Sequence, residues 1–259
     1  MKPEEPKNKK RRQAVEHLKK PIKKYWNKRS SSYGLDKDKS AAIAKTWETV
    51  LHDLVALGAG RKALDVGTGT GQFAVYLANK GFEVTGVDLS EEMIATAQQN
   101  AAQEQLSIRF QTGDAEHLDF PDDSFDVVVS RNLLWTLPQP DQALKEWKRV
   151  LKPGGKLVVS DGFWMNTTWK TVPRLAMNMF RERFNTTSRR SLRFFWGYSK
   201  VRGSLPYYTG VNANDAVTLL EQASFKEIGC YDTACFADHP YRKHQVKKEP
   251  SFFIVHAGK

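Results

Sequence analysis

The sequence predicts a protein of the α/β class, in which helices cover both faces of a mostly parallel sheet. Two observations carry this prediction. From residue 62 to residue 161, short apolar runs of strand type alternate with longer segments of helical spacing. A glycine-rich turn directly follows the first run, where such sheets bind ligands. With 259 residues, 40% of them hydrophobic, the chain can bury such a sheet in one large domain with an insertion.

The predicted elements follow one another in a regular order. Residues 41–57 carry apolar side chains at helical spacing and form an amphipathic helix ahead of the sheet. We expect strands over the ranges 62–66, 82–88, 106–111, 126–130 and 156–161, and helices over 72–81, 90–105 and 140–151. A helix over 212–225 and strands over 226–232 and 250–257 then complete a doubly wound seven-stranded sheet, mostly parallel with an antiparallel closing strand.

Two of the predicted helices carry end signals. Ser90 is placed to cap the helix over 90–105, whose first turn is acidic. Pro153, Gly154 and Gly155 are expected to end the helix over 140–151.

The first strand runs into ALDVGTGTGQFA, which places Gly67, Gly69 and Gly71 at alternate positions. Alternating glycines let the backbone turn tightly or lie against a ligand. The fingerprint of dinucleotide-binding sites, G-x-G-x-x-G, would need a glycine at position 72, where this chain has Gln72. The spacing therefore disfavours a cradle for pyrophosphate.

Three carboxylates stand at the ends of neighbouring predicted strands, namely Asp65, Asp88 and Asp114. Asp88 is placed to accept hydrogen bonds from both hydroxyls of a ribose, which suits NAD as well as other nucleosides. Three carboxylates on one rim would repel a pyrophosphate and would attract a cofactor that carries an amine and a sulfonium. A nicotinamide-dependent oxidoreductase stays as an alternative.

Four motifs in this order give the chain a family resemblance: LDVGTGTG, VDLSEEM, GDAEHLDFPDDSFDVVVSRNLLWTL and RVLKPGGKLVVSD. Over roughly residues 25–160 the sequence resembles class I methyltransferases that use S-adenosylmethionine (SAM). Within that family it looks most like the small-molecule branch related to ubiquinone and menaquinone biosynthesis enzymes. The resemblance implies a Rossmann-like sheet, SAM as the cofactor, S-adenosylhomocysteine (SAH) as its product, and no metal.

The resemblance also implies which positions hold the cofactor. The methionine portion and ribose would lie on Gly67, Thr68 and Gly69, with Asp65 at the amino group and Asp88 at the ribose diol. Leu89 and Met93 would contact the adenine, whose amine would donate to Asp114 beside Ala115. Ser130, Arg131 and Asn132 would border the transferable methyl, and Tyr25 and Tyr33 would close over the cofactor.

Residues 162–210 are expected to form an aromatic and basic lid that chooses the substrate. Such walls fit an anionic molecule that is also aromatic or isoprenoid-like, because Arg pairs with carboxylate or phosphate and stacks on rings. The alternative is that the aromatics form the lid's own core. The candidate substrate residues are Trp135, Trp164, Arg174, Tyr207 and Tyr208.

An oxygen or carbon acceptor usually needs a general base, whereas a thiolate or amine does not. Tyr33, His117 and Tyr208 are the candidates near the expected pocket, and no motif singles out one of them. The sequence shows no Asp/Glu/Asn cluster that would indicate a magnesium site. Cys230 and Cys235 are too few for a disulfide scaffold, so we interpret them as free thiols.

The basic charge is concentrated in two segments. Residues 1–29 hold 12 Lys/Arg against 3 Asp/Glu, and residues 162–206 hold 9 against 1. We expect a basic, flexible or loosely helical tail over 1–24, the SAM-binding core over 25–161 and its last helix and strands over 211–259. The basic segments leave an RNA or protein methyltransferase open as the alternative function.

The N-terminus lacks the apolar stretch of a secretory signal, and no run is long enough to span a membrane. We expect a cytoplasmic protein with a small-molecule substrate. Nucleic acid is a less favoured partner. A peripheral membrane contact through a short basic helix over 14–26 is open.

Overall fold

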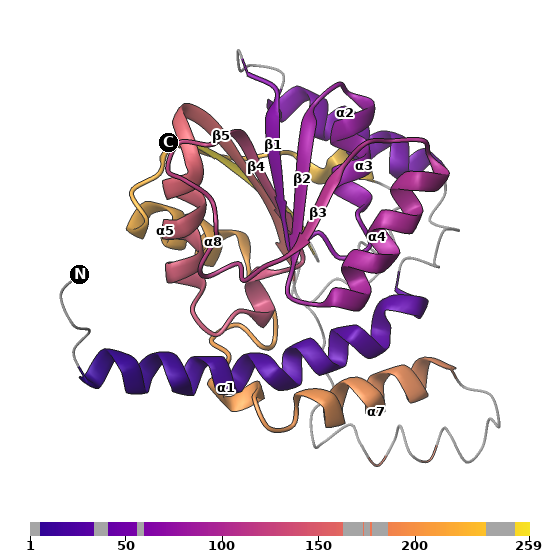
Figure 1. Cartoon of the computed structure of the whole chain (residues 1–259), viewed down its shortest axis with the longest axis vertical. Coiled ribbons are helices and arrows are strands. Elements are labelled where there is room, and N and C mark those ends of the chain that lie inside the picture. Colours follow the sequence, from indigo (N-terminus) through magenta and orange to yellow (C-terminus); the bar gives the residue numbers. More distant parts are fainter. Residues whose placement is uncertain are drawn as a thin grey trace.

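A computed structural model describes residues 6–33, 41–55, 60–162, 173, 177, 186–236 and 252–259. Its centre is one seven-stranded sheet with the strand order β3-β2-β1-β4-β5-β7-β6 (Figure 1). The strands are β1 (Lys62–Val66), β2 (Glu83–Asp88), β3 (Arg109–Thr112), β4 (Phe125–Arg131), β5 (Leu151–Gly162), β6 (Lys226–Cys230) and β7 (Phe252–Gly258).

The strand pairing confirms the predicted sheet. Strands β3, β2, β1, β4 and β5 pair in parallel, and β7 runs antiparallel to both of its neighbours, β5 and β6. β1 has the predicted bounds, because its run of small and apolar side chains is buried from Ala63 to Val66. β5 differs from the prediction: the helix before it ends at Val150, and the strand passes through Pro153, Gly154 and Gly155.

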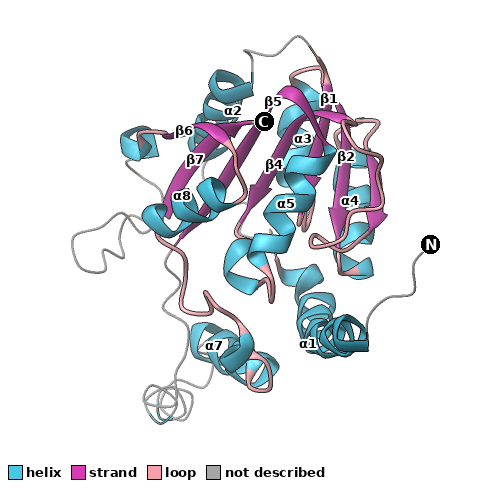
Figure 2. Cartoon of the chain, turned by 90° about the vertical axis from the view of Figure 1, so that its left-hand side faces the viewer, coloured by secondary structure: helices cyan, strands magenta, loops and turns pink. Residues whose placement is uncertain are grey.

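Helices cover both faces of the sheet (Figure 2). On one face lie α2 (Ala41–Val55), α3 (Gln72–Asn79) and α4 (Glu91–Gln103), packed around Trp47, Phe73 and Val129. On the other face lie α5 (Pro140–Val150) and α8 (Ala213–Gln222), packed around Val128 and the fully buried Trp147. Neighbouring residues of β4 therefore face opposite layers, as the period of a strand requires. Ser90 caps α4 as predicted, since its Oγ accepts a hydrogen bond from the Met93 N–H.

Two further helices, α1 (Pro6–Arg29) and α7 (Thr186–Tyr198), lie side by side beyond the carboxyl ends of the parallel strands (Figures 1 and 2). The short 3₁₀ turns are η1 (Ser30–Ser32), η2 (Leu134–Thr136), η3 (Arg202–Ser204) and η4 (Thr233–Phe236). Of the two forms expected for the tail over residues 1–24, flexible or loosely helical, α1 has the helical one. From Pro6 onward this segment is one continuous helix, and Ile22 is 4% exposed against the rest of the fold.

Candidate functional site

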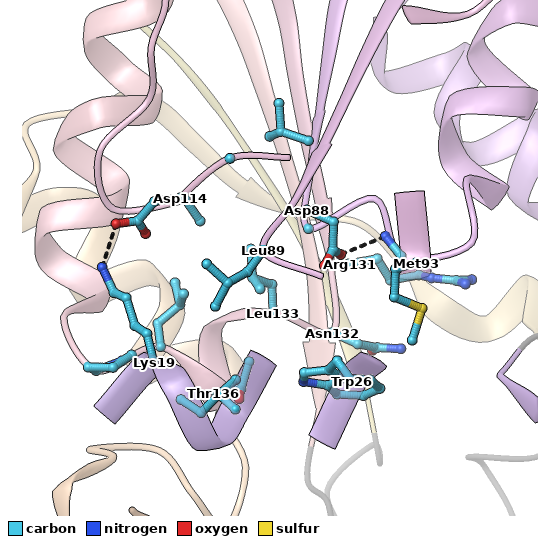
Figure 3. Close-up of a pocket in the computed structure, with 18 of the residues that line it drawn as sticks. Lys19, Trp26, Asp88, Leu89, Met93, Asp114, Arg131, Asn132, Leu133 and Thr136 are labelled. Atoms are coloured by element: carbon cyan, nitrogen blue, oxygen red, sulfur yellow. Dashed lines mark hydrogen bonds and ion pairs between the residues drawn. The ribbon is translucent and has the colours of Figure 1, made fainter. Parts of the chain in front are cut away.

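A cavity opens where β1, β2, β3 and β4 end, and α1 closes it from the far side (Figure 3). With α1 in this position the cavity measures about 80 Å³. Pockets that hold small molecules typically measure about 300–1,000 Å³. A ligand of nucleoside size therefore requires α1, or side chains that it carries, to move outward.

The glycine turn forms the wall of the cavity at the end of β1. Gly67 and Gly69 line the cavity, and both have positive φ, at 69° and 55°. A Cβ atom at Gly67 would lie 2.8 Å from the Leu133 Cδ2 atom, so the close approach requires glycine. Gly71 does not line the cavity; a Cβ there would lie 3.1 Å from Ala97 Cβ, which assigns this glycine to packing against α4.

Asp88 lines the cavity at the end of β2 and fixes the glycine turn. Its Oδ2 atom accepts a hydrogen bond of 2.9 Å from the Gly69 N–H, and its Oδ1 atom accepts one of 2.9 Å from the Ser90 N–H. Burial raises the pKa of the Asp88 carboxyl to about 6, although these backbone hydrogen bonds oppose the shift. Each oxygen keeps a lone pair, so the carboxylate can accept two further hydrogen bonds from a ligand.

Asp65 has a different place from the one implied by the resemblance. Its side chain is buried outside the cavity lining, and its Oδ2 atom accepts hydrogen bonds from Thr68 Oγ1 (2.6 Å) and the Ala74 N–H (3.1 Å). Burial raises its pKa to about 6. Asp65 and Thr68 thus join the glycine turn to the start of α3. Ser130 is also buried outside the lining and donates to the Val66 carbonyl at 2.9 Å.

Asp114 lines the cavity after β3 and is paired with a lysine from α1. The Lys19 Nζ atom lies 2.5 Å from Asp114 Oδ2 and 2.7 Å from Glu116 Oε2 (Figure 3 shows the first pair). Lys19 is 5% exposed and Glu116 is fully buried. Burial alone would lower the pKa of the Lys19 ammonium, but its hydrogen bonds to the two carboxylates outweigh burial and raise that pKa. Lys19 therefore stays charged.

The same acidic group is a cluster that the sequence did not indicate. Asp114, Glu116 and His117 bring three metal-type ligand atoms within 4.8 Å of one another. This group differs from the Asp/Glu/Asn cluster that the sequence analysis considered for magnesium, because its third member is a histidine. The Lys19 ammonium lies against both carboxylates and compensates one of their two negative charges.

Apolar side chains form the part of the cavity between Asp88 and Asp114. Leu89, Met93 and Ala115 all line it, as the resemblance implied, and Ile22 adds a buried apolar side chain from α1. A flat apolar ring with polar edges fits such a slot, because the two carboxylates stand at its ends.

Arg131 and Asn132 line the cavity at the end of β4. Asn132 has a positive φ of 57°, a conformation that asparagine tolerates better than most residues and that is often found at functional sites. Its N–H donates to the Ser160 carbonyl at 2.8 Å, and its own carbonyl accepts from Trp135 Nε1 at 2.9 Å. The Arg131 guanidinium lies over the Phe73 ring at 4.7 Å.

The N-terminal segment supplies more of the cavity than expected. Tyr33 lines it, as predicted, and lies over the glycine turn. Lys19, Ile22 and Trp26 line it too, and sequence reasoning missed all three. Their i, i+3, i+7 spacing, with Leu18 alongside, is a signal for one helix face in a lysine-rich segment. Tyr25, by contrast, points to the other side of α1.

Of the described aromatic side chains of the insertion, Phe194 and Tyr198 pack against α1, and neither lines the cavity. Tyr198 is fully buried, and its hydroxyl hydrogen-bonds Trp26 Nε1 (2.9 Å) and Thr136 Oγ1 (2.7 Å). Ring contacts join Tyr25, Trp135, Phe194, Tyr198 and Tyr208 into one cluster. Of the predicted substrate residues, Trp135, Tyr207 and Tyr208 lie outside the cavity lining, and Trp164 and Arg174 fall outside the described residues.

Of the three candidate bases, only Tyr33 lines the cavity. Burial raises the pKa of Tyr208 to about 12, so its phenol stays protonated near neutral pH. His117 is exposed and lies 3.2 Å from Asp114 Oδ2, outside the lining. Among the described residues no histidine lines the cavity, and the carboxylates that line it are Asp88 and Asp114.

The model of the family described as "Methyltransferase domain" matches residues 64–159. This part of the chain, 96 of its 259 residues, is therefore similar to a methyltransferase domain. The match runs from β1 to β5, so it covers the glycine turn, Asp88, Asp114 and Asn132. The strand ends that line the cavity therefore fall within the matched range.

Known proteins are similar to this part of the chain. A demethylmenaquinone methyltransferase of Deinococcus radiodurans is 38% identical over 122 residues, 46% of this chain and 51% of that protein. The methyltransferase GfsG of Streptomyces halstedii is 36% identical over 140 residues, 53% of this chain and 49% of that protein. The chain thus spans about half the length of these curated relatives.

A solved structure confirms the fold around the matched range. The crystal structure of a SAM-dependent methyltransferase from Aquifex aeolicus superposes with a TM-score of 0.53 at 22% sequence identity. The superposition covers 82% of this chain and 88% of that chain. The sheet order and this likeness together show a Rossmann-like fold.

Proposed function

We propose that this protein binds SAM in the cavity at the strand ends and transfers its methyl group to a small-molecule acceptor. The observation that carries the proposal is the pair of carboxylates on the cavity wall. Asp88 and Asp114 follow adjacent strands, β2 and β3, and both line the cavity beside Gly67 and Gly69. Ribose hydroxyls and an exocyclic amine are the donors that such carboxylates accept from.

The residues present fit SAM group by group. The lone pairs of Asp88 suit a ribose diol, and Asp114 suits the adenine amine on the far side of the apolar slot. Gly67 and Gly69 leave backbone bare where the ribose and methionine portion would lie. Arg131 supplies a cation in reach of the cavity for the methionine carboxylate.

When bound, SAM supplies a methyl group on a positively charged sulfur, which an acceptor nucleophile takes by in-line displacement. The chain's own contribution is to position and to exclude water. Trp26 of α1 and Tyr33, which follows η1, cover the cavity. Asn132 lines the cavity directly after β4, where its N–H donates a hydrogen bond to the Ser160 carbonyl of β5. Since no histidine is among the described residues that line the cavity, we propose an acceptor atom that needs little help to lose its proton, such as a thiolate, an amine or an acidic hydroxyl.

The acceptor class rests on the relatives and on the insertion. One relative's name states that it methylates demethylmenaquinone, a small molecule. In this chain, the aromatic cluster joins α7 to α1 directly behind Trp26, so the insertion is placed to influence what reaches the cavity. We propose an acceptor that is anionic and aromatic or isoprenoid-like.

The test is transfer of label from methyl-labelled SAM to a fractionated cell extract. Label in a small-molecule or lipid fraction supports the proposal and provides a compound to identify. Label in RNA or protein favours the second candidate, a macromolecular methyltransferase that docks through the basic helices α1 and α7. Tight SAM binding without transfer to any fraction would contradict both and indicate a SAM-binding protein without catalysis.

A further inference from the structure

A second, wider hollow lies between α1 and α7, on the side of α1 that faces away from the cofactor cavity. It is a groove of about 1410 Å³. Six cations of the described chain line it: Lys20, Lys24, Lys28, Arg29, Arg193 and Lys200. No Asp or Glu of the described residues belongs to its lining. We call these six residues and the exposed Trp196 among them the basic groove.

One of the six cations of the basic groove, Arg29, is used by the fold: it donates a hydrogen bond to Ser32 Oγ and lies over the Tyr33 ring. Lys20, Lys24, Lys28, Arg193 and Lys200 are exposed and form no ion pair with any described carboxylate. Elsewhere on α1 the structure pairs its lysines: Lys19 and Lys23 bind carboxylates of the core. Within the described chain, α1 therefore has one face whose lysines pair with carboxylates and one face whose lysines do not.

The basic groove follows α1 along one end of the molecule. α1 has 24 residues and is about 36 Å long, and it runs along the end of the fold opposite the strand starts (Figure 1). Lys20, Lys24 and Lys28 recur every fourth residue and so follow one line along it. The residues before Lys19 continue the basic composition of this helix as far as Lys7.

We infer that the basic groove docks the protein on a bilayer that contains anionic phospholipids. A line of cations attracts the negative surface of such a bilayer. Trp196, 60% exposed on α7, adds the residue type that inserts at the interface between headgroups and acyl chains. The cofactor cavity lies on the other face of α1, within one helix diameter of the docked surface, where an acceptor held in the bilayer can reach it.

An anionic bilayer fits the spread of cations and the exposed tryptophan of this surface better than a small anion or a nucleic acid does. A small free anion needs two or three converging cations, whereas these are spread over two helices and several turns. A nucleic acid would also use the cations. However, Trp196 of α7 is a large hydrophobic residue that lines the groove and is 60% exposed. An exposed apolar residue gains more from a bilayer than from a phosphate backbone.

The test is co-sedimentation of the full chain with vesicles, measured without SAM so that it is independent of the proposed function. We expect binding to vesicles of phosphatidylcholine with one quarter phosphatidylglycerol, and little binding to phosphatidylcholine alone. Binding should fall at least tenfold at about 0.5 M NaCl, because salt screens exposed charges. Failure to bind the anionic vesicles at low salt would overturn the inference.

Two charge-reversal variants locate the surface. K20E/K24E should bind anionic vesicles at least tenfold more weakly than the wild type, and so should R193E/K200E on the other wall of the groove. The matched control is K80E/K226E, which makes the same change in net charge at two exposed lysines near the strand starts and should bind like the wild type. Equal losses in all three variants, or tighter binding to single-stranded RNA that the groove variants abolish, would overturn the inference.

Discussion

Lys19 and Lys23 lie about one turn apart on α1, and each forms an ion pair with a carboxylate outside that helix. Their surroundings differ. The Lys19 side chain is 6% exposed and Glu116 is fully buried, whereas the Lys23 side chain is 35% exposed and Glu91 is 54% exposed. Buried charges that lose their partner are costly, and exposed pairs contribute little. The difference makes the two lysines a matched pair for mutation.

We predict that Lys19→Met lowers the free energy of unfolding by about 3 kcal/mol, because Asp114 and Glu116 would be left with no cation between them. Lys23→Met, the control on the same helix, should cost less than about 1 kcal/mol. Urea unfolding of the wild type and both variants measures this. Similar losses in the two variants would show that the Lys19 pairs contribute no more than a surface ion pair.

Asp88 is the side chain on which cofactor affinity should depend most. Asp88→Asn removes the charge that the ribose hydroxyls would donate to, and hydrogen bonds to a charged group contribute about 1.5–3 kcal/mol. We predict that SAH binds this variant roughly 10- to 100-fold more weakly in calorimetry. Asp119→Asn, at an exposed carboxylate after β3 outside the cavity lining, should bind SAH like the wild type. Unchanged affinity in Asp88→Asn would remove Asp88 from the site.

The raised pKa of Asp88 gives SAH binding a pH dependence. Its pKa in the folded protein is about 6, because burial disfavours the charged carboxylate. Ligand hydroxyls donate better to the ionised form, so the affinity should fall about tenfold between pH 7.5 and pH 5, where about a tenth of the carboxylate is ionised. Asp88→Asn should show a flatter profile. The same profile in both proteins would mean that another group titrates.

The pKa shift of Asp88 acts on the stability of the ligand-free protein in the opposite direction. The folded pKa of about 6 lies above the usual value of 3.8. The folded state therefore holds the proton more tightly than the unfolded state. This contribution to the free energy of unfolding is fully present below about pH 4 and is lost as the pH rises through 6.

At the scale of elements, the turn between β1 and α3 forms the wall of the cavity, so the cavity depends on its conformation. Gly67 combines a positive φ with the close contact to Leu133, and Gly69 donates its N–H to Asp88. The sequence predicted this turn, the strands around it and the Ser90 cap, because strand burial, glycine spacing and capping are local signals. The course of β5 through Pro153 was not predictable in this way, since its pairing with β4 and β7 decides it.

Gly67→Ala should disturb this turn more than a glycine substitution with the same backbone cost elsewhere. At Gly81, φ is 81° and the nearest atom to a new Cβ lies 4.0 Å away, so Gly81→Ala carries only the strain of a left-handed residue, about 1–2 kcal/mol. Gly67→Ala adds the clash with Leu133. We predict that Gly67→Ala unfolds at a lower temperature than Gly81→Ala and that only Gly67→Ala loses SAH binding. Equal behaviour of the two variants would contradict a close approach at Gly67.

At the scale of the whole molecule, the sheet was predictable from the sequence and the closure of the site was not. The alternation of strands and helices fixed the order of the core and placed Asp88, Asp114 and the glycine turn at one edge. Lys19 and Asp114 are 95 residues apart, and Trp26 and Tyr198 are 172 apart, so no local pattern announces either contact. The lysine-rich composition of α1 also hid the few apolar residues that bury it.

The sheet core and the two helices α1 and α7 therefore have different roles in the site. The core between β1 and β5 is the part that matches the methyltransferase-domain model, and α1 and α7 pack together beyond the carboxyl ends of its parallel strands. No helix in the described part of the chain is both long and apolar enough to cross a bilayer. The site closes only when α1 is in place, because α1 supplies Lys19, Ile22 and Trp26.

Calorimetric titration of SAM into the purified full chain is the most direct test that this cavity is a SAM site, with NAD⁺ titrated as the control. We predict one SAM bound per chain, competition by SAH, and no heat from NAD⁺ at the same concentration. Binding of NAD⁺ in place of SAM, or SAM binding that is equally strong in Asp88→Asn, would contradict the assignment of this cavity to SAM.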